Sequence, residues 1–227
     1  MNPIIACQNM APFAKYTFAA TGALVDGKPL ICGGDDAKND ECYMITKSST
    51  SFISKMNTKR AYAASVVLNN NILWVLGGSD GLFSHLSSTE YIQIGIGSST
   101  GPELPLAWHA RHAMVALNQS TVMLIGGYSS TLQSSLSKTF YYQESNQDWI
   151  PGPEMDQARY EHAAGLGIDT ATSEQYIAVT GGNDGFGVLD SVGILYSGET
   201  EWQTGKQRAK TRPHKKAHNI ATQEGPQ

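Results

Sequence analysis

The sequence contains no apolar segment long enough to cross a membrane. None of its hydrophobic runs approaches the roughly 20 residues that a transmembrane helix needs. The first residues, Met1 to Pro3, lack the basic region and the long apolar core of a signal peptide. We therefore expect no membrane contact and a cytoplasmic rather than an extracellular location, since secretion would require a longer parent protein that carries a signal peptide.

Charged residues are scarce, at 16% of the chain, whereas glycine is frequent, with 23 residues among 227. This balance suits many short strands and turns better than helices, and no long segment carries apolar residues at helical spacing. The net charge is −4, and residues 206–227 alone carry +5, so the rest of the chain is acidic, at −9. An acidic body argues against nucleic acid as a partner, because binding to phosphates needs a basic surface.

The sequence also lacks a recognisable catalytic or metal-binding motif. Its six histidines show no zinc-like spacing with cysteines or carboxylates, and no nucleophile motif is present. For His112 and His162, a hydrogen-bonded structural role is the better interpretation. We predict that the chain is not an enzyme and that it holds no metal and no cofactor.

Cysteine is rare, with three residues, Cys7, Cys32 and Cys42. If Cys32 ends one strand and Cys42 begins the next, the two could face each other and form a disulfide. We favour free buried thiols, because an odd cysteine count without a secretory signal fits a reducing compartment. The sequon at residues 118–120 would be glycosylated only in a secreted protein, so an extracellular origin stays open.

What the sequence does contain is a repeated Gly-Gly doublet that closes a short apolar run. The first glycines are 44, 49 and 55 residues apart, and self-similarity at such periods is typical of repeat architectures. Each run predicts a buried strand that ends in a turn, where glycine permits positive φ and close approach of a neighbouring strand. The runs with their doublets are Leu30–Gly34, Trp74–Gly78, Met123–Gly127 and Ile177–Gly182.

Other landmarks recur in phase with the doublets. An arginine opens an apolar strand upstream of three of them, at Arg60, Arg111 and Arg159. Downstream come a tyrosine and then, except in the second copy, a further aromatic residue. These residues are Tyr43 and Phe52, Tyr91, Tyr141 or Tyr142 and Trp149, and Tyr196 and Trp202. This order of arginine, apolar strand, Gly-Gly, tyrosine and tryptophan resembles the kelch repeat over residues 14–206, and repeats of about 50 residues fit that family.

The resemblance implies an all-β propeller, in which four-stranded blades stack around a central axis. We place the repeats at about residues 14–59, 60–110, 111–158 and 159–206. Residues 1–13 could form an outer strand of another blade, and residues 207–227 a basic tail or the start of a fifth repeat. Because kelch propellers generally have five to seven blades, four repeats predict an incomplete ring, a fragment of a longer protein and self-association through the open ends.

The resemblance also implies where a partner would bind. In kelch proteins that capture acidic peptides, arginines at this place in the repeat contact the ligand, although these three could equally brace the loops between blades. The polar loops after the doublets should open at the same end of the propeller, and loops held by a rigid scaffold commonly bind partners. The candidate partner-binding residues are Arg60, Arg111, Arg159, Tyr62, His112, Tyr160, Asp36, Ser79, Asp80, Tyr128, Ser129, Asn183 and Asp184.

These features favour a protein-interaction module that binds a protein or an acidic peptide, with a substrate-receptor or scaffold role in a longer parent. A small-ligand or sugar-processing propeller enzyme is the alternative, and a truncated product without independent function is the third interpretation. Pull-down mass spectrometry separates the first two, because a specific protein partner favours the module, whereas a tightly bound sugar without a protein partner favours the enzyme.

Overall fold

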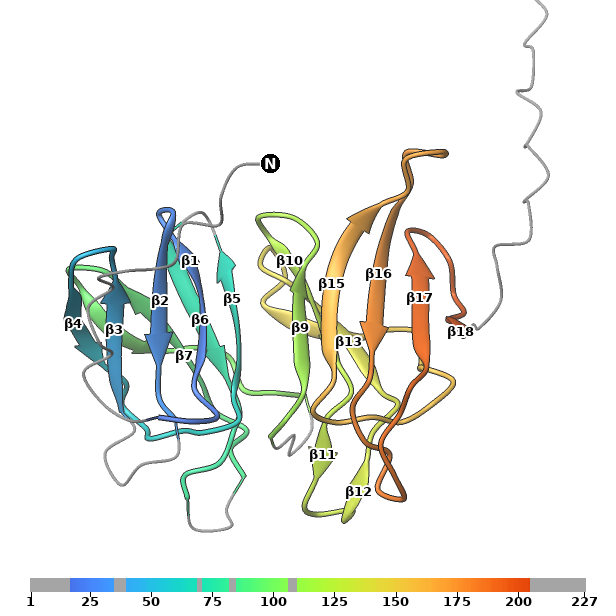
Figure 1. Cartoon of the computed structure of the whole chain (residues 1–227), viewed down its shortest axis with the longest axis horizontal. Helices are drawn as coiled ribbons and strands as arrows, with labels where there is room; N and C mark the ends of the chain where they lie inside the picture. The colour runs from blue at the N-terminus through green and yellow to red at the C-terminus, as the bar shows by residue number, and fades with distance from the viewer. Residues whose placement is uncertain (1–16, 35–39, 69–70, 82–84, 106–109, 205–227) are drawn as a thin grey trace, which may run out of the picture.

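The structure of the protein is a computed structural model, which describes residues 17–34, 40–68, 71–81, 85–105 and 110–204. Every regular element in these residues is a β-strand. Four antiparallel four-stranded sheets form a four-bladed β-propeller arrangement (Figure 1), which confirms the predicted fold class. The described part of the chain contains no helix that is long and apolar enough to cross a membrane. The predictions for residues 1–13 and 207–227 lie outside the described residues.

Each blade is built from strands that follow one another along the chain. Blade 1 consists of β1 (Thr21–Val25), β2 (Lys28–Cys32), β3 (Glu41–Ile45) and β4 (Thr50–Lys55). Blade 2 consists of β5 (Ala64–Leu68), β6 (Ile72–Leu76), β7 (Thr89–Gln93) and β8 (Gly97–Thr100). Blade 3 consists of β9 (Ala113–Ala116), β10 (Thr121–Ile125), β13 (Thr139–Gln143) and β14 (Asp148–Pro151). Blade 4 consists of β15 (Ala163–Ile168), β16 (Gln175–Thr180), β17 (Val192–Tyr196) and β18 (Gln203–Thr204). A small hairpin of β11 (Tyr128–Ser129) and β12 (Ser134–Ser135) follows the doublet of blade 3.

The turns between strands agree with their sequences. Asp26 and Gly27 join β1 to β2 as a two-residue hairpin with φ values of 52° and 72°, the left-handed pair that a type I′ turn requires. The turn at residues 169–174 joins β15 to β16 and accounts for the longer spacing of the fourth doublet. The second repeat lacks the late tryptophan but still forms its outer strand, β8.

The second strands of blades 2 and 3, β6 and β10, are buried on both faces, because each of them packs between two other blades. In β6, Leu73 and Val75 pack against blade 1, whereas Trp74 and Leu76 pack against blade 3. All four side chains are fully buried. This two-sided burial explains why the runs before the doublets are continuously apolar and do not alternate with polar residues.

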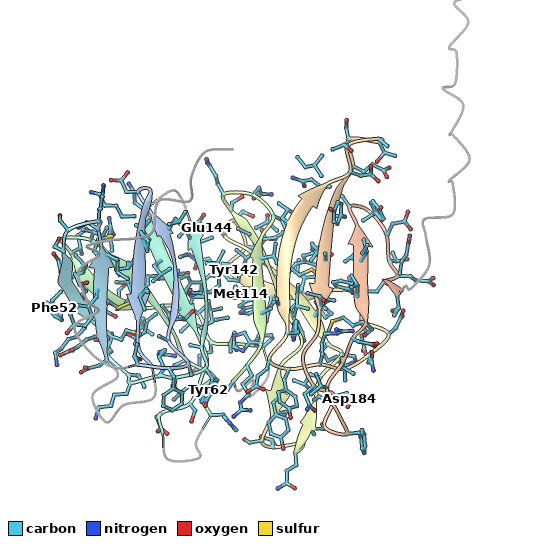
Figure 2. The ribbon with its side chains drawn as sticks, in the orientation of Figure 1. Phe52, Tyr62, Met114, Tyr142, Glu144 and Asp184 are labelled. Carbon is cyan, nitrogen blue, oxygen red and sulfur yellow. A yellow bond between two sulfur atoms is a disulfide. The ribbon has the colours of Figure 1, made fainter. Side chains whose placement is uncertain are left out.

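Trp74 lies at the centre of the interface between blades 2 and 3. Its ring centroid is 5.5 Å from that of Tyr91, 4.7 Å from that of Tyr142 and 5.7 Å from that of Trp149. Its Nε1 donates a hydrogen bond to Thr89 Oγ1 at 2.9 Å, which satisfies the polar end of a buried indole. Figure 2 labels Tyr142 in this interior region. Tyr91, Tyr142 and Trp149 therefore fill the space between blades 2 and 3, as the repeat pattern predicted.

The expectation of free thiols at Cys32 and Cys42 is wrong in this structure, which joins the two residues by a disulfide. They lie directly opposite each other on β2 and β3, with their Cα atoms 4.1 Å apart. Their side chains point into the interface with blade 2. The sequence argument used the cysteine count and the compartment, whereas the strand register decides which two cysteines meet.

The described part of the ring is open between blades 4 and 1. The innermost strands pack in the order β1, β5, β9 and β15, whereas no comparable packing joins β15 to β1 among the described residues. In Figure 1, blade 1 lies at the left and blade 4 at the right, and the inner strands β5 and β9 lie between β1 and β15. One sheet face at each end of the arc is therefore not covered by another described blade.

Candidate partner-binding site

The residues before the inner strands and the loops after the doublets lie at one end of the propeller. Isolated β-bridges connect the two segments in three blades, joining Ala61 to Ser79, Ala110 to Tyr128, and Tyr160 to Asn183. Figure 2 shows Tyr62 and Asp184 at this lower end. The segments before the inner strands and the loops after the doublets thus meet at one end of the propeller, which we call the rim. Asp36 lies outside the described residues.

The β-bridges also correct the alignment of the three repeat arginines. Arg60 and Arg159 each precede the bridged residue of their blade, whereas Arg111 follows it. Arg111 therefore occupies the position of Tyr62 and Glu161, and not that of the other two arginines. All three residues at this position have positive φ, 55° for Tyr62, 70° for Arg111 and 55° for Glu161.

These left-handed residues form a chain of backbone hydrogen bonds from blade to blade. Tyr62 N–H donates to the carbonyl of Ala19, Arg111 N–H to that of Tyr62, and Glu161 N–H to that of Arg111, each at 2.8 Å. Ala19 belongs to the same set, with φ of 55°. We call this chain of four residues the backbone relay. It links successive blades, and the side chains of Tyr62, Arg111 and Glu161 meet at the rim.

Arg60 and Arg159 lie beneath the rim and brace the loops. Both are almost completely buried, at 1% and 2% exposure. The Nη1 atom of Arg60 donates to the carbonyls of Gly77 and Ser88, both at 2.9 Å. Arg159 repeats this arrangement in blade 4, where its Nη1 donates to the carbonyl of Gly181 at 2.8 Å, and burial lowers its pKa. These contacts are the ones expected of arginines that hold loop carbonyls.

Glu90 is a buried carboxylate that the sequence reasoning missed. It accepts hydrogen bonds from Arg60 Nη2 at 2.6 Å, from Ser98 Oγ at 2.6 Å, and from the backbone N–H groups of Asn57 and Thr58. Burial alone would raise the pKa of Glu90, but these hydrogen bonds outweigh it and hold the pKa below its usual value. Glu90 thus fastens the segment between blades 1 and 2 to the face of blade 2.

Arg111 is the arginine of the three that reaches the rim. Its guanidinium lies over the ring of Tyr62, 4.5 Å from the centroid, and 5.8 Å from that of Tyr160. It forms an ion pair with Glu161 at 2.7 Å, with 35% of the Arg111 side chain and 48% of the Glu161 side chain exposed. Tyr128 packs edge-on against Tyr160, with ring centroids 5.4 Å apart. We call Tyr62, Arg111, Tyr128, Tyr160 and Glu161 the rim cluster.

His85 extends the rim cluster toward blade 2. Its ring contacts that of Tyr128, with centroids 6.4 Å apart in an edge-on arrangement. Burial and the nearby charge of Arg111 lower the pKa of His85, so a neutral imidazole faces the tyrosines at neutral pH. The loop position of His85 carries no repeat landmark, which is why the sequence did not indicate it.

The polar residues of the loops mostly stabilise their own turns. Ser79 Oγ accepts from Gly81 N–H, and Ser129 Oγ accepts from Leu132 N–H. Asp184 accepts from the N–H groups of Phe186 and Gly187, which lowers its pKa. Asn183 Oδ1 likewise accepts a hydrogen bond from Gly185 N–H. Asp80, the residue after Ser79, is half-buried. These side chains set loop shape, and their backbones and remaining surfaces are what a partner can reach.

The tips of these loops carry exposed apolar residues. Phe186 is 100% exposed and Val188 is 87% exposed in the loop of blade 4, and Leu132 is 66% exposed in the loop of blade 3. Ser135 Oγ joins the two loops by donating to the carbonyl of Asp184. Exposed apolar groups of this kind often mark a contact surface. The sequence reasoning missed them because it looked for polar loop residues.

His112 and His162 are buried behind the second glycines of their doublets. They are 7% and 8% exposed, and a Cβ on Gly127 or Gly182 would lie 2.9 Å from the histidine Cβ. Burial, and next the charge of Arg159, lowers the pKa of His162 to about 4. His162 is therefore neutral in the folded protein at pH 7, and His112, a predicted partner-binding residue, lies in the interior.

Acidification is expected to destabilise the protein through His162. The unfolded chain binds this proton with the ordinary pKa of 6.5, whereas the folded protein binds it with a pKa of about 4. As the pH falls from 7 to 5, the unfolded state takes up the proton first, so the free energy of unfolding should drop by about 2 kcal/mol. Urea unfolding at both pH values measures this drop. His162→Gln should lose that part of the pH dependence, and an unchanged dependence in the variant would refute the assignment.

No protein-family model matches the chain, and no curated protein matches it. The likeness to kelch repeats therefore rests on the repeated residues of the sequence, and the four-bladed arrangement rests on the structure.

Proposed function

We propose that the chain is a protein-interaction module and that the rim cluster binds a carboxylate-bearing segment of a partner polypeptide. The observation that carries this proposal is the half-exposed guanidinium of Arg111 between the rings of Tyr62 and Tyr160. Aromatic rings on its faces hold the planar fork in one orientation, and that fork matches a carboxylate with two parallel hydrogen bonds. The propeller supports the proposal because it is a rigid scaffold for the loops around this group.

Glu161 indicates how a ligand would engage Arg111. An ion pair as exposed as that between Arg111 and Glu161 contributes little to stability. An Asp or Glu side chain of the partner can therefore take the place of Glu161 at small cost. The exposed Phe186 and Val188 lie on the loop that pairs with Tyr160, where they supply the apolar contact that usually surrounds a charged anchor.

Replacing Arg111 by alanine is expected to weaken such a ligand by about 1–3 kcal/mol, because a charge-assisted hydrogen bond is lost. The probe is the tightest binder from a panel of synthetic peptides that contain Asp or Glu, titrated by calorimetry. Arg111→Lys keeps the charge but not the fork and should recover only part of the affinity. A melting curve of each variant accompanies the titration.

The matched control is Lys138→Ala, which removes a cation from an exposed ion pair with Glu154 outside the rim cluster. It should leave the affinity unchanged. If Arg111→Ala lowers the melting temperature while the affinity stays the same, Arg111 braces the loops and the binding site lies elsewhere.

A further inference from the structure

The outward face of blade 4 has the apolar pattern of an interface but no described blade on it. Ile177 and Val179 of β16 pack against blade 3, so the alternating residues Tyr176 and Ala178 point the other way. Ala178 stands three residues before its doublet, as Leu30, Trp74 and Met123 do in the other blades. Those three side chains are fully buried by the next blade, whereas Ala178 is only partly buried.

The rest of this face is also apolar. Gly165 of β15 and Ile194 of β17 flank Ala178 in the sheet, and Tyr196 lies opposite Tyr176. The two tyrosine rings are in contact, with centroids 5.7 Å apart. A Cβ built on Gly165 would meet no atom within 4 Å, so open space lies in front of the sheet. We call these five residues the blade 4 end face.

Blade 1 presents a complementary face at the other end of the arc, which no described blade covers. Leu30 and Cys32 pack against blade 2, so Ile31 between them points outward. It lies opposite Tyr43, whose ring contacts that of Phe52 at a centroid distance of 5.9 Å. Phe52 is 53% exposed, and Leu24 on β1 is 64% exposed. We call Leu24, Ile31, Tyr43 and Phe52 the blade 1 end face.

The backbone relay ends in a hydrogen-bond donor at blade 1 and in an acceptor at blade 4. Its first member, Ala19, offers an N–H and its last member, Glu161, offers a carbonyl, and neither group forms a hydrogen bond within the described residues. Three times inside the chain, an N–H of the following blade donates to a carbonyl of the preceding one. The blade 4 end face therefore matches a blade 1 end face, and not another blade 4 end face.

We propose that a second copy of this chain covers the two end faces in a head-to-tail arrangement. The blade 4 end face of one copy packs on the blade 1 end face of its partner, and Ala19 N–H of the partner donates to the carbonyl of Glu161. The new contact continues the interface that already repeats three times within the chain. Two copies joined at both ends make eight blades, within the usual range of four to eight for propellers, and a rotation that closes makes a ring of a head-to-tail contact.

Sedimentation velocity of the full chain from about 1 to about 100 µM tests the proposal, and a dimer is expected. Gly165→Glu places a charge on the blade 4 end face, and the open space in front of Gly165 lets the variant fold. Leu24→Glu does the same to the blade 1 end face. Each variant alone should be monomeric, with the dissociation constant raised by about 100-fold or more. Ile96→Glu, at a residue that is 77% exposed in the β7–β8 turn, is the control and should remain a dimer.

Mixing the two variants tests the direction of the contact. Gly165→Glu keeps a normal blade 1 end face and Leu24→Glu keeps a normal blade 4 end face, so the mixture should form a one-to-one dimer through one intact contact. A dimeric Leu24→Glu variant would show that like faces meet, which overturns the proposal. A monomeric wild-type chain at the highest concentration would also overturn it, because the faces would then be covered by other residues of the chain or await a different protein.

Discussion

Replacing Glu90 by alanine is expected to lower the free energy of unfolding by about 3–5 kcal/mol, measured by urea unfolding at pH 7. The carboxylate binds Arg60 and Ser98, both at 2.6 Å, and accepts the N–H groups of Asn57 and Thr58. The substitution leaves the guanidinium of Arg60 buried without its counter-charge, because that side chain is 0% exposed. It also frees the segment that links blade 1 to blade 2.

The control for this prediction is Glu154→Ala. Glu154 pairs with Lys138, and the two side chains are 51% and 50% exposed, so the loss should stay below about 1 kcal/mol. The double variant Arg60→Met with Glu90→Leu should be more stable than Glu90→Ala, because it removes both buried charges and fills their space with apolar atoms. Equal small losses for Glu90→Ala and Glu154→Ala would contradict the assigned role of Glu90.

The fold could be predicted from the sequence because each blade repeats the same local signals. The doublets mark the ends of the second strands, and Asp26 with Gly27 marks a tight hairpin, so strand positions follow from short-range chemistry. The tyrosines and tryptophans were predicted to lie between blades, since large aromatic side chains at a repeated position need a neighbouring blade to bury them. Trp74 shows that a residue outside the repeated tyrosine and tryptophan positions can still become the centre of such an interface.

The site was harder to predict because its geometry depends on register between distant segments. Arg111 stands before an apolar strand like Arg60, but it follows the bridged Ala110, whereas Arg60 precedes the bridged Ala61. Arg111 is therefore displaced by two residues relative to Arg60, and its side chain lies at the rim and not in the interior. Glu90 lies in β7 with no repeat landmark, and three of its partners, Asn57, Thr58 and Arg60, come from the segment between blades 1 and 2. The bridges join segments that are distant in the sequence, so spacing alone could not separate bracing arginines from exposed ones.

The stability of the fold should depend on the glycine doublets, because their second glycines lie against the segment that leads into the first strand of the blade. A Cβ on Gly78 would lie 2.5 Å from the carbonyl oxygen of Ala61 and 3.0 Å from the Cβ of Ala63. Gly182 repeats the arrangement against the carbonyl of Tyr160, also at 2.5 Å. The contacted carbonyls belong to the residues of the β-bridges, so an added methyl group at either glycine would push the rim away from its blade.

Gly78→Ala is therefore expected to lower the free energy of unfolding by about 3–5 kcal/mol, as the sum of backbone strain and steric overlap. The matched control is Gly81→Ala in the same loop. Gly81 has φ of +87°, close to the +93° of Gly78, but a Cβ there would meet no atom within 4 Å. Its replacement should cost only the strain, about 1–2 kcal/mol. Urea unfolding of both variants measures the difference, which isolates the close approach of Ala61. If both variants lose the same free energy of unfolding, the prediction is wrong. Glycine is then required at position 78 only because of its positive φ, and not because of the close contact with Ala61.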